Sequence, residues 1–488
     1  MPRMSTILAY SGAVGFAISQ SIYSYAVSSR FNMQLPELDR IAVVLIVQVI
    51  PVALLLAVRA ATGSRRRLFD ASVFAMSAVM VLLQIYMVAL KGLSSPSRMA
   101  AIVAVAVTGV AVVYAARAHV QSYVVMLGVT SLVMPTYFLV ADTATAVIAT
   151  AARSATVDAR QGPTNTVFVL VFDELSLEIL LDPSHTRIDA TRFPNFARFA
   201  AESVWLRNAR ADYLQTNVSL RSVFTGTYER VDAKGRTFDI EDLPPPNLFS
   251  ELASNGYRVS FYSRYIGCRG AQYNCLRYSE TAPEVLYRFA NFQIGRYVPP
   301  SFRAIAARPD LREAQLLENL GRGEFARAGQ AIIVHVLATH YPYVVSRAGA
   351  VVTSTDTAFE FLNPGDPPEK FAADADRIKS KYVGEVEYVD ARFGMFVDDL
   401  KRTGNWDHAT VVVTADHGTC WVPSCAGRNH IVVPVPSLLR VPLFIRTAGM
   451  KPRISDAAYR HVDFFATMLD ALGLPSRASD GVSMMMVQ

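Results

Sequence analysis

The sequence predicts an α/β domain with a mixed, largely parallel sheet between helices, preceded by an α-helical bundle of about five transmembrane helices. Two observations support this prediction. Five long apolar stretches without Asp, Glu, Lys or Arg lie within the first 141 residues, and from Thr166 short apolar runs are interspersed with segments of helical spacing. The composition agrees, because 52% hydrophobic and 18% charged residues is intermediate between a soluble enzyme and a pure membrane protein. The predicted boundaries are 1–143 for the bundle, 144–165 for a linker and 166–488 for the α/β domain.

The five apolar stretches have about the length that crosses a bilayer, close to 20 residues for a helix. They run over residues 4–29, 41–58, 71–90, 99–116 and 119–141. A cleaved signal peptide would account for the first stretch alone. A transport pathway usually needs ionisable groups inside the membrane, and these stretches have no acidic or basic residue in their cores. The bundle is therefore predicted to anchor the chain or to present a lipid.

The positive charge belongs to the first part of the chain. Residues 1–150 contain ten Lys and Arg against four Asp and Glu, which accounts for the whole net charge of +6. The remainder is neutral, so no basic surface is left for a nucleic acid. Arg59 and residues 65–67 form a basic cluster between the second and third stretches, which the positive-inside rule places in the cytoplasm. Five spans then put residue 166 onward outside the cytoplasm.

The four cysteines form two close pairs in the second part of the chain. They are Cys268 with Cys275 and Cys420 with Cys425. In an oxidising compartment this spacing suits two local disulfide bonds. Four free thiols or a zinc site are the alternatives.

Four strands and four helices are predicted in the α/β domain. The strands run over 167–172, 331–337, 410–415 and 442–446, and the helices over 193–203, 247–255, 378–402 and 461–472. Runs that are apolar on both faces suit the buried centre of a parallel sheet. Three of the strands end at residue types that bind metals, namely Asp173-Glu174, His340 and Asp416-His417. Because ligands gather at the carboxyl ends of such strands, these side chains are predicted to meet.

Asp173, Asp416 and His417 are the candidate metal ligands. Two carboxylates and an imidazole suit Zn²⁺ or Mn²⁺, with Mg²⁺ and Ca²⁺ ranked below them because Ca²⁺ prefers oxygen ligands. A catalytic cation needs a fourth ligand, and that ligand should be the nucleophile. His335 lies inside an apolar run, and we expect it to be a satisfied core histidine.

Several motifs occur in an order that is similar to one known superfamily. They are Val169-Leu170-Val171-Phe172-Asp173-Glu174, Phe193-Pro194-Asn195, Thr216-Asn217-Val218-Ser219 with Thr225-Gly226, Thr339-His340-Tyr341-Pro342, Val413-Thr414-Ala415-Asp416-His417-Gly418, Val441 to Arg446, His461-Val462-Asp463 and Asp480-Gly481. Residues 166–485 thereby resemble the sulfatase and alkaline-phosphatase superfamily. More narrowly, they resemble its membrane-bound phosphoethanolamine and phosphoglycerol transferases.

The resemblance implies that Thr216 is the nucleophile and the fourth metal ligand, because the family's nucleophile lies ten residues before the glycine of its Thr-Gly pair, here Gly226. Sulfatases have a Cys or Ser there, which is converted to an aldehyde hydrate. Threonine cannot be converted in this way, and Val218 and Leu220 replace the Pro and Arg that follow in sulfatases. Sulfate-ester hydrolysis is therefore disfavoured.

The resemblance also implies roles for two histidines. His340 and His430 would bind the phosphoryl group, protonate the leaving group or hold a second metal. His430 follows His417 by 13 residues, near the place where the transferases have a histidine.

The leading expectation is a transferase in a bacterial inner (plasma) membrane, with its catalytic domain extracytoplasmic. It would move a phosphoethanolamine- or phosphoglycerol-type group from a membrane phospholipid donor to an envelope glycan or lipid acceptor, through a phospho-threonine intermediate. A membrane-tethered phosphoester or sulfate-ester hydrolase is the first alternative. The second is a catalytically inactive binding or regulatory domain.

Overall fold

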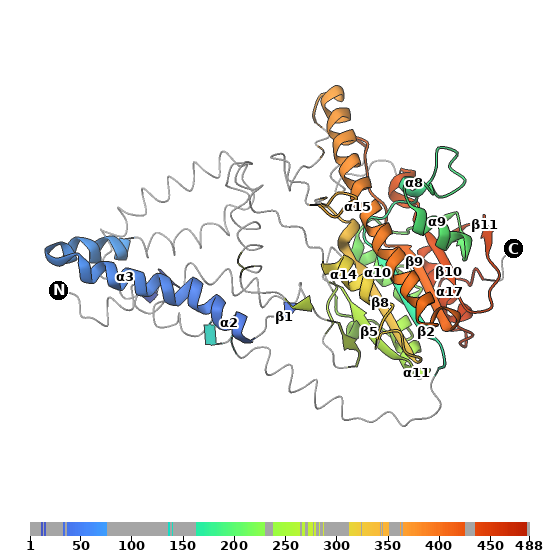
Figure 1. Cartoon of the computed structure of the whole chain (residues 1–488), viewed down its shortest axis with the longest axis horizontal. Helices are drawn as coiled ribbons and strands as arrows, with labels where there is room; N and C mark the ends of the chain where they lie inside the picture. The colour runs from blue at the N-terminus through green and yellow to red at the C-terminus, as the bar shows by residue number, and fades with distance from the viewer. Residues whose placement is uncertain are drawn as a thin grey trace. The chain divides into compact units, whose positions relative to one another are not determined.

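The computed structural model describes most of residues 37–75, 163–229, 238–279, 312–350, 362–424 and 435–485, with short gaps, and a few residues elsewhere. Contacts divide the chain into two compact units. The first comprises Met1–Ser29, Met33–Ala151 and Tyr278–Ile294, and the second comprises Arg30–Asn32, Ala152–Arg277 and Gly295–Gln488. Figure 1 traces both. The predicted spans other than 41–58 fall largely or wholly outside the described residues.

In the described part of the first unit, one helix is long and apolar enough to cross a membrane. It runs over 24 residues, Leu38–Ala61, with 17% of its most apolar window buried. It comprises α2 (Glu37–Val44), a π-helical turn η2 (Leu45–Val49) and α3 (Ile50–Ala61). A core helix of a soluble domain would be mostly buried, so the low burial fits the prediction for 41–58.

The second unit contains an eight-stranded sheet in the order β11-β3-β10-β9-β2-β8-β5-β6. The strands are β2 (Thr166–Phe172), β3 (Val204–Leu206), β5 (Arg258–Tyr262), β6 (Asn274–Cys275), β8 (Gln330–Val336), β9 (Ala409–Ala415), β10 (Leu443–Arg446) and β11 (Arg453–Ser455). The three central strands β8, β2 and β9 pair in parallel. Their residues are almost entirely buried, as apolar runs covered on both faces require.

One predicted strand runs against the others. β10 pairs antiparallel with both β9 and β3. The sheet is therefore mixed and largely parallel, as the sequence predicts.

Helices cover both faces of the sheet. Phe168 of β2 packs edge-on against Phe396 of α15 (Pro368–Arg402). The next residue of β2, Val169, pairs with Ile333 of β8, which in turn pairs with Phe261 of β5, so these three side chains share the other face. On that face Phe261 contacts Phe249 of α11 (Leu248–Ser254). Because adjacent strand residues point to opposite faces, α15 and α11 lie on opposite sides.

The remaining helices join these two layers. α9 (Pro194–Ala201) packs on the α15 side, where Phe196 stacks on Phe393 with ring centroids 5.0 Å apart. α10 (Thr216–Thr225) lies on the α11 side, where Phe224 contacts Phe249. α14 (Arg312–Asn319) contacts α15, and α17 (Phe464–Ala471) contacts α10. α15 begins ten residues before the predicted start. Pro368 lies in its first turn, where a backbone N–H would have no partner within the helix, so proline loses no hydrogen bond there.

Shorter elements make up the rest of the secondary structure in the described residues. They are β1 (Met33–Gln34), η3 (Gly63–Arg65), α8 (Leu177–Leu180), β4 (Ala209–Arg210), η5 (Ile240–Asp242), β7 (Tyr278–Ser279), η6 (Leu337–Thr339), η7 (Trp406–His408), α16 (Pro436–Leu439), β12 (Tyr459–Arg460) and η8 (His461–Asp463). The η8 turn replaces the first residues of the helix predicted from 461. Cys268 and Cys275 form the predicted disulfide bond. Cys420 is also disulfide-bonded, and its predicted partner Cys425 lies outside the described residues.

Candidate active site

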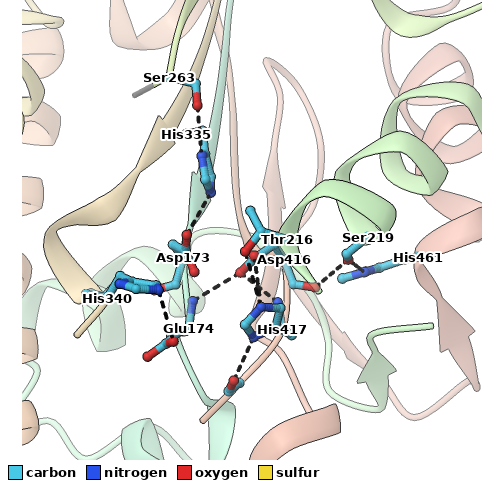
Figure 2. Close-up of polar contacts among 12 residues, drawn as sticks. Asp173, Glu174, Thr216, Ser219, Ser263, His335, His340, Asp416, His417 and His461 are labelled. Atoms are coloured by element: carbon cyan, nitrogen blue, oxygen red, sulfur yellow. Dashed lines mark hydrogen bonds and ion pairs between the residues drawn. The ribbon is translucent and has the colours of Figure 1, made fainter. Parts of the chain in front are cut away.

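The candidate site lies where the central strands end. Asp173 and Glu174 follow β2, Asp416 and His417 follow β9, and His340 follows η6 beyond β8. Figure 2 shows these side chains converging, with Thr216 approaching from the start of α10. Parallel pairing of three neighbouring strands brings their carboxyl ends to one edge, which explains why residues far apart in sequence meet here.

Asp416 and His417 are held by the backbone around them. One oxygen of Asp416, Oδ1, accepts hydrogen bonds from the amides of Glu174 at 3.0 Å and His417 at 2.8 Å. The other oxygen, Oδ2, lies 3.3 Å from His417 Nε2. His417 Nδ1 lies 2.8 Å from the carbonyl oxygen of Gly418, an acceptor that requires a proton on Nδ1. The lone pair of Nε2 is then free to face the site.

Thr216 is the first residue of α10 and is buried, and its hydroxyl oxygen lies 3.4 Å from His417 Nε2. Ser219, one turn later, donates a hydrogen bond of 2.5 Å to the carbonyl oxygen of Asp416. Its hydroxyl also lies 2.9 Å from Nδ1 of His461, which is fully buried. The helix ends at Gly226, whose φ of 66° suits glycine at this position. The start of α10 is thereby tied to the loop after β9.

Asp173 is 1% exposed, and its Oδ2 lies 3.4 Å from Nε2 of His335. Its backbone is fixed at both ends. The Asp173 amide donates to the carbonyl of Val336 at 2.9 Å, and the Thr339 hydroxyl donates to the carbonyl of Asp173 at 2.5 Å. The carboxylate therefore has little freedom to move.

Glu174 occupies a left-handed backbone conformation, with φ of 63°, which is uncommon for a residue other than glycine and often marks a functional turn. The Tyr382 hydroxyl donates to its carbonyl at 2.8 Å and accepts from the Ser176 amide at 3.1 Å. The Tyr343 hydroxyl donates to Glu174 Oε2 at 3.1 Å, and His340 Nε2 lies 3.3 Å from Oε1. Glu174 thus links the loop after β2 to His340.

The charges at the site influence one another. Burial opposes ionisation of Asp173, but His340, His335 and His417 outweigh it and lower the pKa of this carboxyl group. Burial and the charge of Asp173 raise the pKa of Asp416 to about 6. Burial, aided by His417, lowers the pKa of His461 to about 3. His461 is therefore neutral at pH 7.

The donor set fits a divalent cation. Asp173 Oδ1 and Asp416 Oδ2 are buried and have no hydrogen-bond partner among the described residues. Ligand atoms of Asp173, His335 and Asp416 lie within 4.8 Å of one another, and so do those of Asp173, Glu174 and His340. Buried carboxylates without partners are costly unless a cation neutralises them. Zn²⁺ and Mn²⁺ accept such mixed nitrogen and oxygen ligands.

The structure brings Asp173, Thr216, Asp416 and His417 together, with His340 beside Glu174, and His430 lies outside the described residues. Their chemical roles remain predictions. The sequence analysis assigns no role in the site to three polar residues that face this cluster, namely His335, His461 and Ser219. Ser219 and His461 belong to motifs that carry the family resemblance, and Ser219 also lies one turn after Thr216. His335 was expected in the core, where it lies, but no sequence pattern indicates its contact with Asp173.

Comparison with known proteins agrees with this architecture. A family model described as Sulfatase matches residues 165–474. A relative from Trinickia caryophylli, the multifunctional alkaline phosphatase superfamily protein PehA, is 28% identical over 116 residues, which cover 22% of each chain. The match therefore spans about a fifth of that curated relative.

Two solved structures are also similar. The phosphonate monoester hydrolase SpPMH from Silicibacter pomeroyi has a TM-score of 0.47 and 18% identity, covering 66% of this chain and 76% of that chain. The lipoteichoic acid synthase LtaP from Listeria monocytogenes has a TM-score of 0.40 and 15% identity, covering 68% of this chain and 80% of that chain. Likenesses of this size do not identify an activity. The family model, however, extends over more than half of the chain, and the protein therefore belongs to the sulfatase family of the alkaline phosphatase superfamily.

Proposed function

We propose that this chain is a membrane-anchored, metal-dependent transferase that uses Thr216 as its nucleophile. It would move a phosphoethanolamine- or phosphoglycerol-type group from a membrane phospholipid to an envelope glycan or lipid. The observation that supports this most is the approach of the Thr216 hydroxyl to His417 Nε2, 3.4 Å away, beside two buried carboxylates. The apolar helix Leu38–Ala61 supports membrane attachment.

Asp173, Asp416, His417 and Thr216 would hold the cation. When bound, it would lower the pKa of the Thr216 hydroxyl and neutralise charge on the phosphoryl oxygens. A threonine hydroxyl is otherwise a weak nucleophile at neutral pH. The hydrogen bonds of Ser219 and the backbone contacts of Asp416 keep the start of α10 and the β9 loop in register, which preserves the distance between nucleophile and ligands.

In the first step, Thr216 Oγ1 would lose its proton to solvent and form a bond to phosphorus, and the bond from phosphorus to the lipid alkoxide would break. His340 is the residue we assign to protonate that alkoxide. Its Nδ1 lies 2.5 Å from the carbonyl oxygen of Tyr341, and its partly exposed ring directs Nε2 toward Glu174. Histidine is the side chain that most often acts as a general acid. In the second step, an acceptor hydroxyl would give its proton to His340 and form the bond to phosphorus, and the bond from phosphorus to Thr216 Oγ1 would break.

The test is intact-mass spectrometry of the full chain, purified in detergent and incubated with mixed phospholipids and Zn²⁺ or Mn²⁺. Wild type should gain the mass of a phosphorylated head group, and Thr216→Ala should not. Thr225→Ala is the matched control, because Thr225 lies at the far end of the same helix and bonds to Arg221 O. Absence of an adduct on wild type under slowed turnover would contradict Thr216 as nucleophile and favour an inactive domain. An adduct that is released only to water would identify the hydrolase instead.

A further inference from the structure

His335 is the histidine that the proposed chemistry leaves unused. It lies near the end of β8 and is fully buried, between Val334 and Val336. In the parallel ladder it pairs with Val171 of β2. Residues two apart on a strand point to the same face, so His335 and Asp173 lie on the same side of the sheet, as Figure 2 shows.

Both ring nitrogens of His335 point at polar atoms. Nδ1 lies 3.1 Å from the hydroxyl oxygen of Ser263, which also accepts a hydrogen bond of 2.9 Å from the amide of Ile266. Nε2 lies 3.4 Å from Oδ2 of Asp173. That contact does not have hydrogen-bond geometry, and Nε2 has no hydrogen-bond partner among the described residues. A buried imidazole nitrogen that faces carboxylates without bonding to them needs another explanation.

The distances between candidate ligand atoms explain the orientation of His335. Three pairs of candidate ligand atoms lie 3.3 to 3.4 Å apart: Thr216 with His417, His417 with Asp416, and His335 with Asp173. Two ligands of one tetrahedral cation, each bound at about 2.0–2.1 Å, are separated by roughly 3.3–3.4 Å. The His335 pair therefore has the spacing of two ligands of a common ion. The ligand atoms of His335, Asp173 and Asp416 also all lie within 4.8 Å of one another.

We propose that His335 Nε2 is an additional protein ligand of the cation held by Asp173, Asp416 and His417. In this assignment Nδ1 carries the ring proton and donates a hydrogen bond to the Ser263 hydroxyl oxygen, which fixes the tautomer and the ring plane. Outer hydrogen bonds of this kind commonly orient histidine ligands. The inference rests on the metal site of the proposed function but does not depend on which group is transferred.

A second imidazole ligand changes which divalent ion the site binds most tightly. Two carboxylates balance the charge of a divalent ion, and two imidazole nitrogens favour Zn²⁺ over Mg²⁺ and Ca²⁺, which prefer oxygen ligands. Thr216 would then be an additional ligand beside four others. Without His335, the proposed set of Asp173, Asp416, His417 and Thr216 contains a single nitrogen ligand.

The experiment counts imidazole ligands directly. Full-length protein in detergent is loaded with Zn²⁺ and examined by X-ray absorption at the zinc edge, for wild type, His335→Gln and the control His185→Gln, whose side chain is 64% exposed. We expect His335→Gln to lose one imidazole from the zinc shell and to bind Zn²⁺ at least about 100-fold more weakly in a chelator competition. His185→Gln should match wild type in both measurements.

Ser263→Ala keeps the inference testable if His335→Gln does not fold. It should keep the wild-type imidazole count and lose about 10-fold in Zn²⁺ affinity, since only the orientation of the ring is weakened. An unchanged imidazole count in His335→Gln would overturn the inference and make His335 a positioning partner of Asp173, as would a single imidazole in the wild-type shell. A wild-type protein that binds no Zn²⁺ or Mn²⁺ would overturn the proposed metal site itself.

Discussion

Removing one hydroxyl group from Tyr382 should loosen the turn that carries Asp173 and Glu174. Tyr382 is fully buried on α15, and its hydroxyl bridges two backbone groups, the carbonyl of Glu174 at 2.8 Å and the amide of Ser176 at 3.1 Å. Tyr382→Phe keeps the ring and its contacts with Tyr343 and Trp421 but takes away both hydrogen bonds. The substitution therefore isolates the hydroxyl.

The expected cost follows from those two groups. A buried polar group that loses its partner costs about 1–3 kcal/mol, so the loss of both partners should destabilise the α/β domain by about 2–6 kcal/mol. The positive φ of Glu174 is also costly unless its surroundings hold it. Release of the turn should therefore move the Glu174 amide away from Asp416 and weaken cation binding in addition.

The assay is thermal unfolding of metal-free protein in detergent, followed by a Zn²⁺ titration of the same samples. Tyr228→Phe is the control, because Tyr228 is 46% exposed. We expect Tyr382→Phe to lower the unfolding temperature by several degrees and to reduce Zn²⁺ affinity, while Tyr228→Phe changes neither. An unfolding temperature within one degree of wild type would refute the reasoning that this hydroxyl holds the turn.

Three further predictions concern other parts of the domain. Asp390 on α15 accepts hydrogen bonds from the Asn195 amide, the Asn195 side chain and the Phe196 amide at 3.2, 2.9 and 2.7 Å. Asp390→Ala should lower the free energy of unfolding of the domain by about 3–5 kcal/mol, measured by chemical denaturation. An equal effect of Asp390→Asn would argue against the importance of the charge of Asp390. Loss of the Cys268–Cys275 bond, which closes a loop over a sequence separation of 7, should cost about 2–3 kcal/mol, measured as a lower unfolding temperature of Cys275→Ser; no change would mean that the loop is held by other contacts. The pKa of His461 is lowered by burial to about 3, so its contribution to stability is complete above about pH 6.5 and declines as pH falls toward 3, by about 1.4 kcal/mol per unit. His461→Asn should be less stable at pH 7 but flatter with pH between 6 and 4, and parallel profiles would contradict this assignment.

The centre of the fold could be predicted from the sequence because its strands are apolar on both faces. The runs at β2, β8 and β9 stand out for that reason, and the observed bounds differ from the predicted ones by at most one residue at each end. The edge strand β11 and its neighbour β3 could not be predicted, because three residues carry no periodicity. The antiparallel direction of β10 could not be predicted either, since an apolar run of four residues has the same pattern in a parallel and an antiparallel strand.

The candidate site divides in a similar way. Asp173, Asp416 and His417 were predictable because polar residues directly follow buried strands. Thr216 needed the family resemblance, since its own neighbours give no sign of a nucleophile. His335 could not be assigned, because only the register between β8 and β2 brings it to Asp173. The predicted five-span bundle, its orientation and the donor and acceptor stay predictions beyond the one described apolar helix.

The order of the central strands has a consequence for biosynthesis. β2 is made first, yet it pairs with β8 and β9, so its ladder is complete only after Ala415 has been synthesised. Synthesis proceeds at about 5–20 residues per second. The uncharged run Thr166–Phe172 is therefore without its final neighbouring strands for on the order of ten seconds or more. A run of this length that is rich in β-branched and aromatic residues and lacks proline is prone to pair with other chains. We therefore expect nascent copies of this protein to depend on a chaperone that covers β2 until the second half of the domain has emerged.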